Sequence, residues 1–317
     1  MTHKIPILFT FDPSLVMPAG VCFTSLLENA LPGTFYEIIV IHSARYRLER
    51  ERLDRVAEIY GNAIIRYIPV AEEFENAFVA RGIPETAYYR LISAKLLPEY
   101  DKVLYSDVDV IFREDLSKYY DLDLGDSYFA ATDNVLAKQT GAGSYPARVL
   151  GIDPSKGYYY SGNLVINLAQ IRKDGLMDVF RELGRNNYDY QDMDIINIAC
   201  NGRIKDLGPV FCLAAQLYKF LVKEPERMEK EYSPEQREAA LDHGIVHFNG
   251  PKPWQKACLN MDIWWYYYRR SIFFDQYFCY DFWYLRQYYL ESLTFFKRVK
   301  LLLRYWKDKK SFEQVVG

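Results

Sequence analysis

The sequence has few cysteines, little net charge and no long apolar run, and each absence argues against a class of protein. Its five cysteines, an odd number, lie far apart without a Cys-x-x-Cys pair, which argues against a disulfide framework or a thiolate zinc site and favours the cytoplasm. A formal net charge of −3 gives no basis for nucleic-acid binding. No stretch approaches the length of a transmembrane helix, and the N-terminal residues lack the apolar core of a signal peptide.

Glycine-rich nucleotide-binding loops are also missing near the start of the chain. No Gly-x-Gly-x-x-Gly follows the first apolar run, which argues against a dehydrogenase. A nucleotidyltransferase also combines paired carboxylates, a metal and a nucleotide, but it more often begins with a glycine-rich, basic loop. This chain begins Phe9-Thr10-Phe11-Asp12-Pro13 instead. The nucleotidyltransferase therefore remains only as an alternative function.

Alternating strand-like and helix-like segments dominate the first 200 residues. The predicted strands are 5–11, 37–42, 63–70, 102–107, 128–132 and 164–168. The predicted helices are 19–31, 46–60, 84–97, 170–183 and 191–201. This order predicts an α/β fold, with a mostly parallel sheet flanked by helices. Ligands of such sheets bind beyond the carboxyl ends of the strands, where Asp12 and Asp107 are expected.

The central motif is Asp107-Val108-Asp109, at the end of an apolar run. Side chains two positions apart in extended backbone point the same way, so the two carboxylates can converge while Val108 packs behind them. Converging carboxylates repel each other and favour a bound cation, for which oxygen ligands indicate Mg²⁺ or Mn²⁺ bridging to a diphosphate. An isolated Asp-x-Asp is frequent by chance, however, and a solvated turn explains most cases.

Four further segments accompany this motif in a fixed order. They are Tyr-Arg-Leu at 89–91, Tyr-Tyr-Ser-Gly-Asn-Leu-Val-Ile-Asn-Leu at 159–168, Asp-Met-Asp at 192–194, and His-Phe-Asn-Gly-Pro-Lys-Pro-Trp at 247–254. Over roughly residues 5–260 the set resembles the family 8 retaining glycosyltransferases, in particular bacterial enzymes that transfer galactose or glucose to lipopolysaccharide. The resemblance implies a GT-A fold, UDP-galactose or UDP-glucose as donor, and a saccharide or lipid-linked acceptor.

The resemblance also implies which residues bind the metal and the diphosphate. Asp107, Asp109 and His247 would ligate the cation, and an imidazole ligand favours Mn²⁺ over Mg²⁺. Lys252 would stabilise the leaving diphosphate as a mobile point charge, and Gly250 would let the backbone approach the phosphates. A core histidine, a surface lysine and a turn glycine are the ordinary alternatives.

Further contacts to the UDP-sugar are implied in the same way. Asp12 would lie near the uracil and ribose, Arg90 and Val108 at the donor, and Asp133 and Asp192 at the sugar hydroxyls, for which carboxylates are strong acceptors. The alternatives are a strand-end cap for Asp12, a helix-surface ion pair for Arg90, and helix N-terminal acids for Asp133 and Asp192.

Two departures from the family pattern concern catalysis. Tyr160 stands where the family usually has Asn, and Met193 stands where it commonly has a Gln thought to face the anomeric carbon. A thioether cannot supply the same hydrogen bond. Three interpretations remain: Asp192 or Asp194 does more, the acceptor attacks from the leaving-group face without a protein nucleophile, or the chain is a weakened UDP-sugar-binding protein. The predicted catalytic set is Asp192, Met193 and Lys252, with retention of anomeric configuration.

The composition changes sharply near residue 260. Residues 262–306 hold 19 of the 52 aromatic residues, and residues 297–310 hold seven basic residues and one acid. The change predicts a catalytic domain over 1–260 and a helical extension over 261–317. Since the chain has 28 tyrosines, a self-glycosylating primer is a further alternative.

Within the extension, residues 293–310 have the pattern of an amphipathic helix. Apolar residues recur at helical spacing at Phe295, Phe296, Val299, Leu302, Leu303 and Trp306. Basic residues lie mainly on the opposing side at Lys297, Lys300, Arg304 and Lys307. This pattern predicts attachment to an anionic membrane surface, at the inner face of the membrane. Packing against the catalytic domain or a dimer contact is the alternative.

Overall fold

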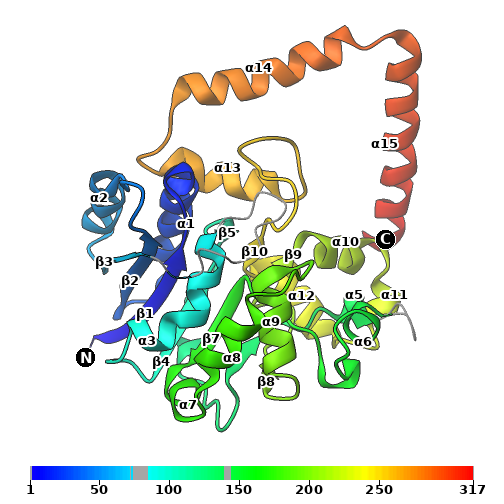
Figure 1. Ribbon diagram of the computed structural model, residues 1–317. Coiled ribbons are helices and arrows are strands. Elements are labelled where there is room, and N and C mark those ends of the chain that lie inside the picture. Colours follow the sequence, from blue (N-terminus) through cyan, green and yellow to red (C-terminus); the bar gives the residue numbers. More distant parts are fainter. Residues whose placement is uncertain (1, 72, 74–84, 139–143, 317) are drawn as a thin grey trace.

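The computed structural model describes residues 2–71, 73, 85–138 and 144–316 (Figure 1). The described strands are β1 (His3–Thr10), β2 (Thr34–Ser43), β3 (Ala63–Val70), β4 (Lys102–Ser106), β5 (Val110–Ile111), β6 (Phe129–Ala131), β7 (Asn163–Asn167), β8 (Ile204–Asp206), β9 (Leu213–Ala214) and β10 (Val246–His247). The described 3₁₀ helices are η1 (Pro13–Leu15), η2 (Glu85–Ile92) and η4 (Pro154–Lys156).

The described α-helices lie between and after these strands. They are α1 (Val16–Glu28), α2 (Arg50–Tyr60), α3 (Ser93–Leu96), α4 (Ser117–Tyr120), α5 (Val135–Lys138), α6 (Tyr145–Arg148), α7 (Leu168–Lys173), α8 (Leu176–Leu183), α9 (Gln191–Ala199), α10 (Ala215–Lys223), α11 (Pro225–Met228), α12 (Pro234–His243), α13 (Met261–Arg270), α14 (Gln276–Ser292) and α15 (Phe295–Val316).

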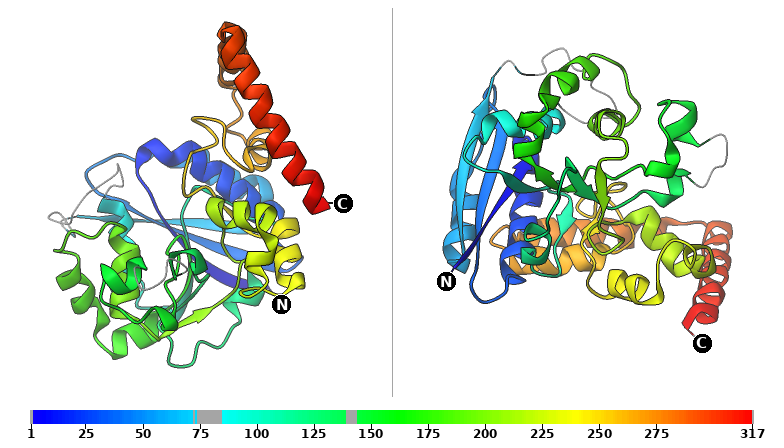
Figure 2. Two further views of the ribbon diagram at one scale, coloured as in Figure 1. Left: turned by 90° about the vertical axis from the view of Figure 1, so that its right-hand side faces the viewer. Right: turned by 90° about the horizontal axis from the view of Figure 1, so that it is seen from below.

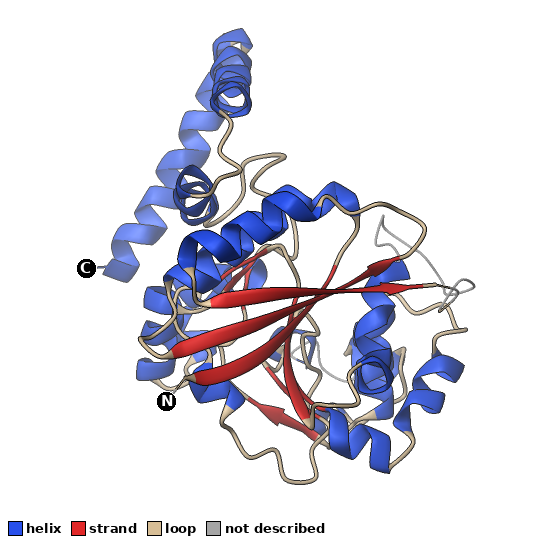
Figure 3. Cartoon of the chain, turned by 90° about the vertical axis from the view of Figure 1, so that its left-hand side faces the viewer, coloured by secondary structure: helices blue, strands red, loops and turns tan. Residues whose placement is uncertain are grey.

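The main sheet has the order β3-β2-β1-β4-β7-β6-β8 among the described residues. The pairs β3-β2, β2-β1, β1-β4 and β6-β8 are parallel, whereas β7 runs antiparallel to both of its neighbours. Alternate side chains of the strands enter two separate cores, as Phe9 and Leu8 do, and helices cover both faces (Figure 3). The structure confirms the predicted α/β fold with a mostly parallel sheet.

A second, three-stranded sheet lies beside the carboxyl end of β4. Strand β10 pairs antiparallel with β5 and parallel with β9. In this register His247 lies opposite Val110, one residue after Asp109. The small sheet therefore carries a histidine from late in the sequence to the Asp-x-Asp segment.

Four predicted helices differ from those observed by more than two residues at one end or in their continuity. The helix predicted at 19–31 is α1, which lies at Val16–Glu28. The segment predicted as helix 84–97 is η2 followed by the short α3. Every residue of η2 after Glu85 is buried, so η2 lacks the exposed face of an amphipathic helix, and Pro84 lies outside the described residues. Predicted helix 170–183 is two helices, because Gly175 adopts a left-handed conformation (φ 64°) between α7 and α8. Helix α2 begins at Arg50 rather than at residue 46 and ends at Tyr60, as predicted, where Gly61 follows in a left-handed conformation.

The C-terminal region consists of the predicted aromatic helices. Helix α13 packs against α1, where Trp264 is fully buried and the side-chain amide of Asn29 donates to the Tyr267 hydroxyl at 2.8 Å. Helices α14 and α15 then project from the rest of the chain, and α15 returns toward α10 (Figures 1 and 2). Among the described residues, no helix combines the length and apolarity needed to span a bilayer.

Candidate active site

The Asp-x-Asp segment connects the two sheets. Strand β4 ends at Ser106, after which the Asp107 amide donates to the Gly162 carbonyl at 2.8 Å. Two residues later the Phe248 amide donates to the Asp109 carbonyl at 2.9 Å, and β5 begins at the next residue. Val108 is buried in the first core, as predicted. The backbone on both sides therefore fixes the direction of the two carboxylates.

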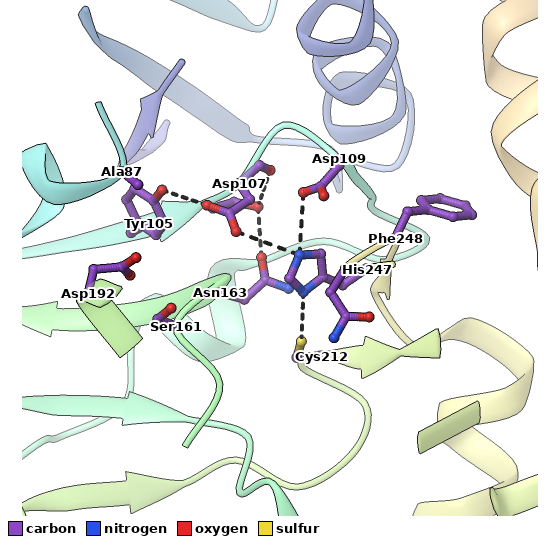
Figure 4. Close-up of polar contacts among 12 residues, drawn as sticks. Ala87, Tyr105, Asp107, Asp109, Ser161, Asn163, Asp192, Cys212, His247 and Phe248 are labelled. Carbon is purple, nitrogen blue, oxygen red and sulfur yellow. Dashed lines mark hydrogen bonds and ion pairs between the residues drawn. The ribbon is translucent and has the colours of Figure 1, made fainter. Parts of the chain in front are cut away.

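The carboxylates of Asp107 and Asp109 converge on the imidazole of His247. One ligand atom from each of the three residues lies within 4.8 Å of the others. The Nε2 atom of His247 is 3.6 Å from Asp107 Oδ2 and 3.3 Å from Asp109 Oδ1 (Figure 4). Two carboxylates and one imidazole form a donor set that suits a divalent cation such as Mn²⁺.

Two positively charged side chains contact Asp109 in this cluster. The Lys252 ammonium donates to Asp109 Oδ2 and, at 2.8 Å, to the Phe248 carbonyl. Burial alone would raise the pKa of Asp109, but Lys252 and His247 hold it well below its ordinary value. Burial alone would lower the pKa of His247, but attraction to Asp109 outweighs it and raises the pKa to about 10. The carboxylate of Asp109 therefore attracts positive charge, which His247 and Lys252 supply in this structure.

Arg90 connects this cluster to a second acid. Its buried guanidinium donates to Asp107 Oδ1 at 2.9 Å and to the Ser161 carbonyl at 2.6 Å. Its Nε lies 3.3 Å from Asp192 Oδ2, and its Cζ atom lies 4.2 Å from the centroid of the Tyr105 ring. Burial raises the pKa of Asp192 to about 6 although Arg90 opposes the shift. Arg90 is therefore a buried ion-pair residue rather than a surface one.

Asp194 points to different partners from those of Asp192. Its carboxylate accepts the hydroxyls of Tyr145 and Tyr158, each at 2.6 Å, and the Tyr190 amide at 2.8 Å. The side chain is completely buried. Because both oxygens are already used, Asp194 is suited to hold the 145–158 segment against α9 rather than to bind a sugar.

The other predicted donor contacts lie around the cluster in varied settings. Asp12 follows β1 at the sheet edge, where burial and the nearby Glu85 raise its pKa. Asp133 follows β6 and accepts the Tyr158 amide at 3.1 Å through its side chain. Gly250 is exposed, and a Cβ added there would meet no atom within 4 Å, so the backbone itself does not require glycine at this position.

Two residues that contact the His247 ring were not predicted from the sequence. Cys212 Sγ lies 3.6 Å from His247 Nδ1, and Gly162 faces the same ring so closely that a Cβ would lie 2.2 Å from its Cε1 atom. Gly162 had a signal, since it falls within the 159–168 motif. Cys212 had none, because it sits in an ordinary apolar segment.

The mostly parallel sheet, with the Asp-x-Asp and histidine cluster at its carboxyl edge, has the GT-A fold. The model of Glycosyl transferase family 8 matches residues 6–258, so the chain belongs to this family and is a sugar-transferring enzyme.

The chain is also similar to individual proteins. General stress protein A of Bacillus subtilis (strain 168) is 25% identical over 256 residues, which cover 77% of this chain and 85% of that protein. The Escherichia coli lipopolysaccharide 1,2-glucosyltransferase is 25% identical over 252 residues, which cover 77% of this chain and 71% of that protein. The crystal structure of the galactosyltransferase LgtC with donor and acceptor sugar analogs is 25% identical and gives a TM-score of 0.71, covering 86% of this chain and 98% of that one.

Proposed function

We propose that this chain is a metal-dependent, retaining hexosyltransferase that transfers galactose or glucose from a UDP-sugar to a saccharide or lipid-linked acceptor. The cluster of Asp107, Asp109 and His247 carries the proposal, since it joins two carboxylates and an imidazole at the edge where α/β sheets bind ligands. Similar proteins named above are a lipopolysaccharide glucosyltransferase and a galactosyltransferase with sugar analogs bound.

The three ligand side chains fit Mn²⁺ or Mg²⁺, with the imidazole favouring Mn²⁺. When bound, the cation would neutralise negative charge that develops on the UDP leaving group. Lys252 is partly exposed and pairs with Asp109, so its ammonium could exchange this carboxylate for a phosphate oxygen of the donor. Because the site already concentrates positive charge, these residues would favour departure of the diphosphate.

Arg90 and Asp192 would orient the donor sugar beside this cluster. Asp192 is buried and keeps acceptor capacity for sugar hydroxyls, and Arg90 fixes its position. Asp133 would supply a further acceptor for sugar hydroxyls, and Asp12 would contact the uridine. Held in this way, the donor presents its anomeric carbon to an acceptor hydroxyl that attacks with net retention of configuration.

A screen of UDP-sugars tests the proposal. UDP-galactose or UDP-glucose should raise Tm and be hydrolysed slowly with Mn²⁺, and EDTA should remove both effects. GDP-mannose serves as the control donor, and His247→Ala as the control variant. Failure of every UDP-sugar to stabilise the protein with Mn²⁺ would contradict the donor, and an inverted product anomer would contradict retention.

A catalytically weakened UDP-sugar-binding protein is the second candidate function. It is favoured by Met193 and Tyr160, which replace the family's usual Gln and Asn. Tyr160 is buried, and its hydroxyl donates to Asn134 Oδ1 at 3.0 Å. Under this alternative the same screen would give Mn²⁺-dependent stabilisation without hydrolysis or transfer.

We also propose that the catalytic domain spans 1–260 and that the extension 261–317 attaches it to an anionic membrane at the cytoplasmic face. Helix α13 joins the two parts because it packs on α1. Along α15 the apolar side chains are largely exposed, with 73% for Phe295, 83% for Phe296 and 61% for Trp306. Lys297, Lys300 and Arg304 are exposed on the same helix, whereas the side chain of Lys307 lies outside the described residues. Exposed aromatic and basic residues on one helix are typical of interfacial attachment.

Liposome flotation of the full chain tests this attachment. The protein should float with anionic vesicles at low salt and stay in solution with neutral ones. Replacing Phe295, Phe296 and Trp306 together by Ser should abolish flotation without lowering turnover on a soluble acceptor. If the unsubstituted protein stays in solution with both lipids, the extension packs against another protein surface instead.

A further inference from the structure

Both ring nitrogens of His247 have partners within the protein. Its Nε2 atom faces the two carboxylates, and its Nδ1 atom lies 3.6 Å from the sulfur of Cys212, which is completely buried (Figure 4). Cys212 immediately precedes β9, which pairs with the strand that carries His247; Ala214 lies opposite His247 in this register. Two adjacent strands therefore set the distance between the sulfur and the imidazole.

Gly162 restricts the ring from another side. A Cβ at this position would lie 2.2 Å from the Cε1 atom of His247, 2.7 Å from Nδ1 and 3.0 Å from Nε2. The carbonyl of Gly162 also accepts the Asp107 amide, so the backbone that touches the ring is tied to the Asp-x-Asp segment. The imidazole thus lies against the backbone at Gly162 and meets the sulfur at one nitrogen.

This arrangement determines which nitrogen can bind a cation. A neutral imidazole carries one hydrogen, and the other nitrogen offers its lone pair to the metal. In metal sites the N–H usually donates to a carboxylate, a carbonyl or water, which fixes the tautomer and the ring. Here a thiol sulfur, a weak acceptor, occupies that place.

We propose that Cys212 is a positioning residue for the metal ligand, accepting the Nδ1 hydrogen of His247 and so directing the Nε2 lone pair toward Asp107 and Asp109. This role rests on the metal-dependent function proposed above. It assigns a task to a buried cysteine that is not among the proposed metal ligands. It also explains why the residue facing the ring at position 162 is a glycine, since any side chain would push the imidazole off this line.

Direct measurement of Mn²⁺ binding tests the role without relying on turnover. Free Mn²⁺ is followed by electron paramagnetic resonance in the presence of saturating UDP. We expect Cys212→Ala to weaken Mn²⁺ binding by about tenfold, the lower end for loss of such a partner. Cys212→Ser keeps an acceptor and should recover part of the affinity. Cys200→Ala is the matched control, because Cys200 is equally buried but lies in the second core.

A purely structural role of Cys212 predicts different results. It would lower Tm for Cys212→Ala and Cys200→Ala alike and leave the Mn²⁺ dissociation constant of both unchanged, which would overturn the proposal. Cys212→Ser that binds Mn²⁺ no better than Cys212→Ala would also overturn it, because the acceptor would then be irrelevant. If the unsubstituted protein binds no Mn²⁺, the metal site itself fails, and the role of Cys212 fails with it.

Discussion

Two of the chain's Asp-x-Asp motifs, at residues 107–109 and 192–194, lie at the candidate site, but their carboxylates have different kinds of partner. In Asp107-Val108-Asp109 both carboxylates reach the same histidine, and the middle residue is buried behind them. In Asp192-Met193-Asp194 the first acid pairs with Arg90, whereas the second is taken up by tyrosines. With the same spacing, the two carboxylates therefore converge in the first motif and diverge in the second.

Backbone conformation explains the difference. Residues 107–109 form a bend between β4 and β5, and hydrogen bonds from the Asp107 amide and to the Asp109 carbonyl hold both of its ends. Residues 192–194 lie in the first turn of α9, where side chains two positions apart diverge. The pair in the bend can share one cation, and the helical pair can reach two different sets of partners.

The Asp107-Val108-Asp109 motif should show the largest effect on substitution. Asp109→Asn keeps the shape of the side chain but removes the charge between His247 and Lys252. We expect Mn²⁺-dependent UDP binding to be lost and kcat/KM to fall on the order of 1,000-fold, because a charge that stabilises the leaving group disappears. Calorimetric titration of UDP with and without Mn²⁺ measures the loss. A fall of less than tenfold with a normal Tm would remove Asp109 from the metal site.

Asp192 should come second, with an effect on both activity and pH dependence. Asp192→Asn should lower kcat/KM roughly 100-fold, because a charged acceptor for the sugar and for Arg90 becomes neutral. In the unsubstituted enzyme, activity should fall as the pH drops below about 6, where Asp192 becomes protonated. A pH–rate profile with no change near pH 6 would argue against an ionised Asp192 in the reaction.

The raised pKa of Asp192 also predicts how the stability of the protein changes with pH. Its pKa is raised on folding from about 4 to about 6. Folding therefore favours the protonated form, and this stabilisation is fully present below pH 4 and lost as the pH rises through 6. The amide of Asp192→Asn does not titrate, so the variant lacks this pH-dependent stabilisation. The Tm of the variant minus the Tm of the unsubstituted protein should therefore be higher at pH 7.5 than at pH 4.5. Equal differences at both pH values would contradict the shift.

Asp194, in the helical motif, should affect folding more than chemistry. Asp194→Ala leaves the buried hydroxyls of Tyr145 and Tyr158 without their acceptor and should lower the free energy of unfolding by about 2–4 kcal/mol. Tyr158→Phe removes one of these bonds and should cost about 1 kcal/mol. Urea unfolding measures both variants. Turnover per folded molecule should fall less than tenfold, and a loss as large as that of Asp192→Asn would make Asp194 a direct participant.

This contrast also separates what the sequence predicts from what it cannot. Strands such as 63–70 follow from local apolar pattern, and the pairing of Asp107 with His247 follows from resemblance to a family. The different fates of Asp192 and Asp194 depend on Arg90 and on segment 145–158, which are far away in the chain. Cys212 likewise acquires its contact only through strand pairing, so no local pattern marks it.

Met193, between the two helical acids, should have the smallest effect. Its backbone is fixed on both sides, since its amide donates to the Tyr190 carbonyl at 3.0 Å and its carbonyl accepts Asn197 Nδ2 at 2.8 Å. The side chain is half-buried and packs against the first core. Substitution therefore changes the side chain while the helix keeps its position.

Two variants of Met193 separate packing from chemistry. Met193→Ala should reduce kcat about two- to fivefold through lost packing around the acids, with little change in Mn²⁺ binding. Met193→Gln has nearly the same length and adds the amide that the family commonly carries, so turnover should be retained or raised, with the same product anomer. Rates and anomers are measured with the donor selected by the UDP-sugar screen. If Met193→Gln falls below Met193→Ala, an amide beside Asp192 harms this site, and the enzyme works with an apolar side chain where its family uses a hydrogen bond.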